Sequence, residues 1–342
     1  MKHATILDVA REAGVSKSLV SLVMRDSDRV SPSSREAVLE AAKKLGYRPN
    51  AAARTMVRQR SSVIGVMVSD LHNPFFADVI DGIDMAVGDA GYRSILTTGN
   101  RVSDRERLAV ATLLEMRVDG LIMVSPVVNR GCAIEASESV PVVVVGKATR
   151  APTVDSVTND DRNGAGMVID HLVELGHRRI AHIDGGIGAG SQPRRTGYSR
   201  SMKRHGLENE IRSVRGGFTE DGGSMGMQSL LATGPRPTAV FVANDLAAIG
   251  VLKVLDTEGL SVPDDISVVG YDNTSMAASH RLGLTTVDQP RHDMGRMAAE
   301  LVLASIDQPR STASHAVLSP KLVIRESTGP PPTSLEGEKR RP

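Results

Sequence analysis

Six short apolar runs, each followed by polar residues and then by a helical repeat, constrain the fold of this 342-residue chain most strongly. Each run is rich in β-branched residues and lacks the alternation of a half-exposed strand, so it predicts a strand buried on both faces. Such strands, alternating with helices, form parallel α/β sheets. The runs, with the polar or glycine residues that follow them, are 63–68 before Ser69, 121–124 before Ser125, 142–145 before Gly146, 180–183 before Asp184, 240–243 before Asn244 and 266–269 before Gly270.

Polar residues at the ends of these predicted strands indicate a ligand cleft. In open parallel sheets, ligands bind beyond the carboxyl ends of the strands, where these residues would lie. One such residue alone is more often a turn or a helix cap, and the set of six favours a cleft. A weaker run near 159–161 divides the units into two groups, which predicts a two-lobed body. The helical repeats run over 76–89, 104–116, 164–175 and 247–256.

The first 24 residues have the pattern of two short amphipathic helices joined by a glycine turn. Thr5 and Asp8 have the spacing of a capping box for the first helix. Gly14 permits the tight turn, and Ser16 is placed to cap the second helix. This is the helix-turn-helix pattern, whose second helix enters the major groove of DNA, although a merely solvated polar face is the alternative. The side chains expected to reach base edges are Lys17, Ser18, Ser21 and Leu22.

A third helix and a short hinge segment follow. Ser31 and Pro32 have the types that open a helix, as cap and first helical residue. The segment 49–60 contains alanines that Asn50 can cap, and it is too short to be stable alone, so we expect it to fold when docked on DNA. Met56 would then be a wedge for a minor-groove base step, or it would simply pack against the next domain.

Charge is distributed unevenly along the chain. Residues 1–60 hold 12 Lys and Arg against six Asp and Glu, whereas the other 282 residues hold 29 against 34. A basic head on an acidic body suits a protein in which only the head contacts phosphates. The single cysteine, Cys132, excludes an intrachain disulfide and fits a reducing cytoplasm. Because no apolar run resembles a signal peptide or a membrane span, we expect a cytoplasmic protein without membrane contact.

Enzymatic motifs are weak. The glycine-rich run 185–190 follows a predicted strand, but Ser191 stands where a dinucleotide fingerprint requires its third glycine, so a flexible loop is the better interpretation. The nine histidines show no zinc-binding spacing, and no nucleophile elbow is present. We therefore expect no catalytic activity, no metal and no cofactor.

Four N-terminal segments, 5–20 (TILDVAREAGVSKSLV), 30–35, 45–50 and 53–56, resemble the head and hinge of the lactose-repressor (LacI) family of bacterial transcription regulators. The resemblance implies that Lys17, Ser18 and Leu22 hold the three specificity positions, and that Met56 stands where the family usually has an intercalating leucine. Leu22 departs from the arginine or histidine of many members, so a polar base contact is lost or becomes apolar. The predicted DNA-contacting set is Thr5, Ser16, Lys17, Ser18, Ser21, Leu22, Arg29, Asn50, Ala53, Arg54 and Met56.

The body also resembles this family, through its similarity to the periplasmic sugar-binding fold. The segments that carry this resemblance are 70–76, 117–125, 175–180, 237–245, 262–272 and 284–290. An arginine, an aspartate, an amide and an aromatic face are groups that hold polyhydroxylated rings. Lys147 stands where the family often has an Asp-Arg pair, which leaves its role open, and Arg195 is a rival for Arg194. Simple caps at the strand ends are the alternative for Asn244 and Asp272, and a core position is the alternative for Phe76. The effector pocket implied by the resemblance comprises Phe75, Phe76, Ser125, Lys147, Arg194, Phe218, Asn244 and Asp272.

We therefore expect an effector-controlled transcription regulator, most simply a repressor and not an enzyme. It would bind double-stranded operator DNA as a homodimer, or as a tetramer, under the control of a small-molecule effector, most simply a sugar. The alternatives are a regulator that responds to a purine or nucleoside and one that is controlled by a protein corepressor. The expected domains are an all-α helix-turn-helix head (1–48), a hinge helix (49–60), a two-lobed α/β body with parallel sheets (61–328) and a disordered tail (329–342). Within the body, we expect an N-lobe of about 61–159 plus 290–320 and a C-lobe of about 160–289 plus 321–328.

Overall fold

The structure, a computed structural model, describes residues 4–24, 27–47, 60–279, 283–308 and 312–333. Its contacts divide the chain into two compact units, Met1–Ser61 and Ser62–Pro342. The hinge helix predicted over 49–60 lies outside the described residues, except for Arg60.

The N-terminal unit has three helices among its described residues, packed around a small apolar core. Thr5 caps the first helix, because its Oγ1 accepts from the Asp8 N–H at 3.4 Å while its own N–H donates to Asp8 Oδ2 at 2.9 Å. Gly14 makes the turn with a φ of 64°, and Ser16 Oγ accepts from the N–H of Leu19 at 3.1 Å. The helices are α1 (Ile6–Glu12), α2 (Lys17–Val23) and α3 (Pro32–Lys44), with Val9, Val20, Val23 and Val38 buried between them.

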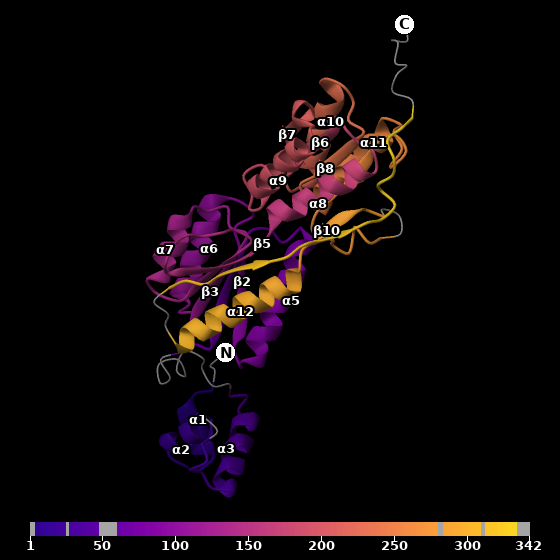
Figure 1. Ribbon diagram of the computed structural model, residues 1–342. Helices are drawn as coiled ribbons and strands as arrows, with labels where there is room; N and C mark the ends of the chain where they lie inside the picture. The colour runs from indigo at the N-terminus through magenta and orange to yellow at the C-terminus, as the bar shows by residue number, and fades with distance from the viewer. Residues whose placement is uncertain (1–3, 25–26, 48–59, 280–282, 309–311, 334–342) are drawn as a thin grey trace. The chain divides into compact units, whose positions relative to one another are not determined.

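The body contains two parallel sheets, each at the centre of one lobe (Figure 1). The larger sheet has, within the described residues, six strands in the order β11-β5-β4-β3-β1-β2. All neighbouring pairs in it are parallel, and this sheet with its helices is the N-lobe. Its strands are β1 (Val63–Val68), β2 (Arg93–Thr98), β3 (Gly120–Val124), β4 (Val142–Val145), β5 (Val154–Asn159) and β11 (His315–Leu318).

Helices cover both faces of the N-lobe sheet, as continuous apolar strands require. From β1, Val66 packs against α5 and α12, whereas Met67 faces α6 and α7. Gly82 and Gly295 let α5 and α12 cross closely, because a Cβ at Gly82 would lie 2.1 Å from a carbonyl oxygen of α12. The helices are α5 (Pro74–Asp89), α6 (Ser103–Glu115), α7 (Arg130–Ser137) and α12 (Arg291–Asp307).

The smaller parallel sheet defines the C-lobe and, in the described part of the chain, has the order β7-β6-β8-β9. Helices α8 and α9 pack on one face of it, and α10 and α11 pack on the other. The strands are β6 (Ile180–Asp184), β7 (Arg212–Arg215), β8 (Ala239–Val242) and β9 (Ser267–Val269). The helices are α8 (Asp161–Glu174), α9 (Ser191–Arg204), α10 (Glu220–Ala232) and α11 (Asp245–Thr257), with a short 3-10 helix η1 (Glu208–Glu210).

The chain passes between the lobes more than once. Strand β5 ends in the N-lobe and α8 begins the C-lobe; the chain later returns from β10 (Thr286–Asp288) to α12. It then crosses again from β11 to β12 (Lys321–Val323), which pairs antiparallel with β10 beside α8 (Figure 1). These crossings place the carboxyl ends of both parallel sheets around one space between the lobes.

The predicted fold class is confirmed: a helix-turn-helix head and an α/β body with parallel sheets. The predicted tail begins too early, however. Gly329 accepts a hydrogen bond from His177 at 2.9 Å and donates one to Ser267 at 3.1 Å, so the backbone there is held by the C-lobe. Residues 334–342 lie outside the described residues. No helix in the described part of the chain is long and apolar enough to cross a membrane.

Candidate functional site

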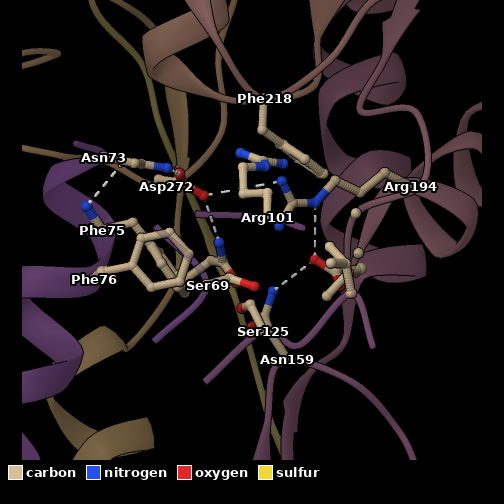
Figure 2. Close-up of a pocket in the computed structure, with 17 residues that line it drawn as sticks. Ser69, Asn73, Phe75, Phe76, Arg101, Ser125, Asn159, Arg194, Phe218 and Asp272 are labelled. Carbon is tan, nitrogen blue, oxygen red and sulfur yellow. Dashed lines mark hydrogen bonds and ion pairs between the residues drawn. The ribbon is translucent and has the colours of Figure 1, made fainter. Parts of the chain in front are cut away.

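A cleft with an empty volume of about 540 Å³, including space open to solvent, lies between the two lobes (Figure 2). Residues from the carboxyl ends of strands in both lobes line it, as expected for parallel sheets. They are Ser69, Asn73, Phe75, Phe76, Arg101, Ser125, Val127, Gly146 and Asn159 from the N-lobe, and Asp161, Gly188, Ala189, Gly190, Arg194, Phe218, Asp272 and Gln289 from the C-lobe side.

Arg194, from the first turn of α9, is the buried cation of the cleft. Its Nε donates to Asp161 Oδ1 at 3.0 Å, and its Nη1 donates to the carbonyl oxygen of Ala243 at 2.6 Å. The guanidinium carbon lies 3.7 Å from the centre of the Tyr271 ring, close enough for a cation–π contact. Nη1 also lies 3.9 Å from Asp272 Oδ1. The planar guanidinium is thus fixed before any ligand arrives, which favours directional hydrogen bonding.

Asp272 follows β9 and is buried, with a φ of 115° that side chains rarely adopt. Gln289 Nε2 donates to its Oδ1 at 2.6 Å, and Asn73 Nδ2 donates to its Oδ2 at 3.5 Å. Burial raises the pKa of the Asp272 carboxyl to about 7, although Arg194 acts in the opposite direction. The carboxyl therefore titrates near neutral pH in the absence of a ligand.

Phe218 forms an aromatic wall that the glycine run 185–190 makes possible. A Cβ added at Gly185 would lie 2.2 Å from the ring, and one at Gly188 would lie 2.6 Å from it. The guanidinium carbons of Arg101 and Arg194 lie 5.2 and 5.6 Å from the ring centre. The sequence favours a flexible loop for the glycine run; in the structure, its glycines give the ring room in the cleft.

The N-lobe side of the cleft combines aromatic and hydroxyl groups. Phe75 and Phe76 are both buried in the first turn of α5, with their rings edge-to-face at 5.3 Å. Ser125 has a φ of 50° at the end of β3. Ser69 directly follows β1, and its hydroxyl donates to the buried carboxylate of Glu106. That carboxylate also accepts from the backbone N–H groups of Val127 and Val128, both at 2.8 Å, so it anchors two cleft-lining segments.

Six of the eight residues predicted to bind an effector line this cleft: Phe75, Phe76, Ser125, Arg194, Phe218 and Asp272. Asn244 and Lys147 do not. Asn244 is a buried helix cap, whose Oδ1 accepts from the N–H of Ala247 at 2.9 Å. Lys147 turns away toward a separate cavity, with Nζ 3.4 Å from the carbonyl oxygen of Pro126. Arg195, the rival for Arg194, instead pairs with Asp184 at 3.4 Å and is half exposed.

Sequence reasoning missed five polar lining residues, namely Asn73, Arg101, Asn159, Asp161 and Gln289. One signal was available: Asn73 directly precedes Pro74, the combination of cap and first helical residue. Arg101 and Gln289 follow strands that the sequence did not reveal, so no strand end marked them.

In the head, the predicted DNA-contacting residues differ in exposure. Thr5, Ser16, Lys17, Ser18 and Arg29 are exposed, and Ser21 and Leu22 are half-buried. Leu22 packs against the core of the head, so its side chain has a structural role as well. Asn50, Ala53, Arg54 and Met56 lie outside the described residues.

Comparisons with known protein families find a match in each of the two units of the chain. The model of bacterial regulatory proteins of the lacI family matches residues 5–50, and a periplasmic binding protein-like domain matches residues 169–328. Catabolite control protein A of Priestia megaterium is 34% identical over 333 residues, which cover 95% of this chain and 99% of that protein.

Two solved structures extend the likeness. The lac repressor dimer bound to operator and the anti-inducer ONPF has a TM-score of 0.86 at 29% identity, over 96% of this chain and 100% of that one. The complex of the transcriptional regulator CelR with cellobiose has a TM-score of 0.71 at 33% identity, over 95% of this chain and 99% of that one. This chain belongs to the lacI family of bacterial regulatory proteins, which are DNA-binding transcription regulators and not enzymes.

Proposed function

We propose that this chain is a transcriptional repressor whose affinity for operator DNA is controlled by a small molecule, most simply a sugar, bound between the lobes. The arrangement of Arg194, Asp272 and Phe218 around one cleft carries this proposal. A fixed guanidinium, a carboxylate and an aromatic face provide the hydrogen bonds and the apolar surface that a polyhydroxylated ring requires.

The charges of the cleft favour a neutral effector. Its lining holds two cationic side chains, Arg101 and Arg194, and two carboxylates, Asp161 and Asp272. A phosphorylated ligand would bring negative charge to a site whose arginines already face carboxylates, and burying it would be costly. A sugar, a purine base or a nucleoside meets no such penalty. The cellobiose found on CelR supports the sugar among these, with a nucleoside or purine as the second candidate.

We assign DNA reading to the N-terminal end of α2. Lys17 and Ser18 are exposed there, beyond the cap that Ser16 provides. The N-terminal residues of a recognition helix are those that contact base edges in this motif. The lac repressor dimer, whose structure is bound to operator, supports operator DNA as the partner. We propose that the effector acts on operator binding through the hinge segment 49–60, with Met56 as a wedge, by ordering or releasing this segment. Such a repressor acts where bacterial DNA lies, in the cytoplasm.

We also propose that the chain acts as a homodimer through the β2 edge of the N-lobe sheet. Strand β2 is an edge strand, and its Ile95 and Leu96 are partly exposed. Helices α5 and α6 both contact β2 and expose Met85 and Leu108. An apolar edge of this kind would be a liability in a monomer. Two heads would then bind two half-sites, as this motif usually does.

A test measures binding to operator DNA, selected from random duplexes, with and without a panel of sugars and nucleosides. We expect one compound to change the operator affinity of the parent chain, and the Arg194→Lys variant to lose the response. Lysine keeps the positive charge beside Asp161 but cannot reproduce the planar fork. An unchanged response in the variant would refute the assignment of the cleft. Operator binding that no compound alters would favour control by a protein corepressor. Calorimetry of the full chain with the same panel would then check whether any of these compounds binds.

A further inference from the structure

Asn159, the last residue of β5, has an unpartnered acceptor at the cleft. Its side chain is buried, with 7% of the residue exposed, and its Oδ1 accepts no hydrogen bond. Five buried side-chain nitrogen or oxygen atoms of the described residues make no hydrogen bond: Thr97 Oγ1, Asn159 Oδ1, Arg179 Nε, His182 Nε2 and Arg291 Nη1. Among these, Asn159 Oδ1 alone belongs to a residue that lines the cleft.

The neighbours of Asn159 fix which atom of its amide is the free one. Nδ2 donates to the hydroxyl of Tyr271 at 3.0 Å and to Asp161 Oδ1 at 3.4 Å. An ionised carboxylate only accepts hydrogen bonds, so an amide turned the other way would set two acceptors against each other. Asp161 is itself held by the Nε of Arg194 at 3.0 Å. The C-lobe therefore holds the amide nitrogen, and the oxygen is left for another donor.

A buried acceptor without a donor costs free energy, and a ligand that supplies the donor recovers it. We propose that Asn159 is a specificity-determining residue of the cleft, whose Oδ1 accepts a hydrogen bond from a hydroxyl or N–H group of the effector. The inference rests on the proposed function and deepens it, because it states which group the effector must present at the end of β5.

This requirement separates classes of ligand. A hydroxyl of a sugar or the N–H of a base can donate to Asn159, whereas an ether oxygen, a methoxy group or a carboxylate cannot. A carboxylate or phosphate at this position would also face the nearby Asp161 carboxylate. Sites built to bind a donor discriminate strongly against analogues that lack it, because the buried acceptor is then left unpaired.

Isothermal titration calorimetry on the full chain tests the proposal with D-glucose, D-ribose, cellobiose and adenosine. For each that binds, analogues with one hydroxyl replaced by hydrogen or by methoxy are titrated in turn. We expect one position at which both replacements weaken binding about tenfold or more in the parent chain. The original compound should bind the Asn159→Ala variant more weakly than the parent chain by a similar factor. The analogues altered at that position should bind the variant about as weakly as they bind the parent chain.

Asn163→Ala is the matched control, since Asn163 is an exposed asparagine on α8 outside the cleft lining. The analogue series on the parent chain identifies the hydroxyls that must donate, and Asn159→Ala assigns one of them to Asn159. If the series shows no position at which both replacements weaken binding, the proposal is overturned without any variant. If a compound binds the cleft and the Asn159→Ala variant of the chain still discriminates fully between that compound and its analogues, the proposal is overturned. The proposed function would then remain intact. Binding by none of the four compounds would overturn both.

Discussion

Asn73 of the N-lobe donates a hydrogen bond to Asp272 of the C-lobe, with Nδ2 and Oδ2 3.5 Å apart across the cleft. The same asparagine caps α5, because its Oδ1 accepts from the N–H of Phe75 at 3.0 Å. One side chain thus fixes the start of a helix that lines the cleft and also joins the two lobes. The position of the lobes and the shape of the site are therefore linked through this residue.

Removing that link should weaken effector binding. For Asn73→Ala, we expect the lost cap to lower the free energy of unfolding by about 1 kcal/mol, and the lost bridge to weaken effector binding about fivefold. The control is Asn129→Ala, which removes a comparable cap from α7, where Asn129 Oδ1 accepts from the N–H of Cys132 at 3.3 Å. Urea unfolding and calorimetry measure both effects. Equal effector affinities in the two variants would contradict a contribution of the Asn73–Asp272 hydrogen bond to effector binding.

The titration of Asp272 should make both stability and binding depend on pH. Burial raises the pKa of its carboxyl to about 7, above its ordinary value of 3.8. Between about pH 4 and 7, the folded chain holds a proton that the unfolded chain has lost, so the free energy of unfolding should fall as pH rises. An effector that donates hydrogen bonds to the carboxylate should bind more tightly with rising pH and release a proton.

Calorimetry in buffers of different ionisation enthalpy measures that proton release near pH 7. Asp272→Asn is the comparison, and its proton release should be smaller. Some pH dependence of stability should remain in this variant, because burial also raises the pKa of Asp245 to about 6. If parent and variant released the same number of protons, the titration would belong to another group.

Lys17 should contribute to operator affinity more than a lysine of the body does. Lys17→Ala removes an exposed cation at the start of α2, and we expect specific binding to weaken about tenfold. A contact to a base edge should also relax specificity at one position, whereas a phosphate contact would reduce the salt dependence instead. Lys253→Ala, an exposed lysine of α11 paired with Glu220, is the control. Fluorescence anisotropy on selected and scrambled duplexes would show whether the two variants differ.

Dimerisation should depend on the β2 edge. Leu96→Asp places a charge on the partly exposed edge strand, and we expect it to shift the chain toward monomer in sedimentation experiments. Val317→Asp is matched to it, because Val317 is exposed on β11, the opposite edge of the same sheet. If Val317→Asp dissociated the chain and Leu96→Asp did not, the interface would lie at the other edge.

The strands that sequence reasoning found are those with continuous apolar runs, such as β3 and β4, which are buried on both faces. It missed β2 because an edge strand needs no such run, and its sequence RSILTT is half polar. It missed β10 because three residues are too few to show a period. Arg101 and Gln289, which follow these two strands, could not be assigned to a strand end for the same reason.

The roles of strand-end residues were harder to predict than their positions. Asn244 and Asp272 each follow a C-lobe strand, yet only Asp272 lines the cleft. The difference arises because Asn244 caps α11, so that its side-chain oxygen accepts from the N–H of Ala247, whereas Asp272 precedes an irregular segment. Asn159 gave no signal, since its role depends on a hydrogen bond to Tyr271, 112 residues away in the chain. Such long-range pairings are set by tertiary packing and leave no local periodicity.

We propose that occupation of the cleft and binding of operator DNA are coupled. This coupling is tested by measuring the effector affinity of the free protein and of the operator complex, together with the operator affinity with and without effector. We expect the ratio of the two effector affinities to equal the ratio of the two operator affinities, and both ratios to differ from one, since coupling between two sites is reciprocal. A compound that fills the cleft by calorimetry, yet leaves both ratios at one, would contradict it.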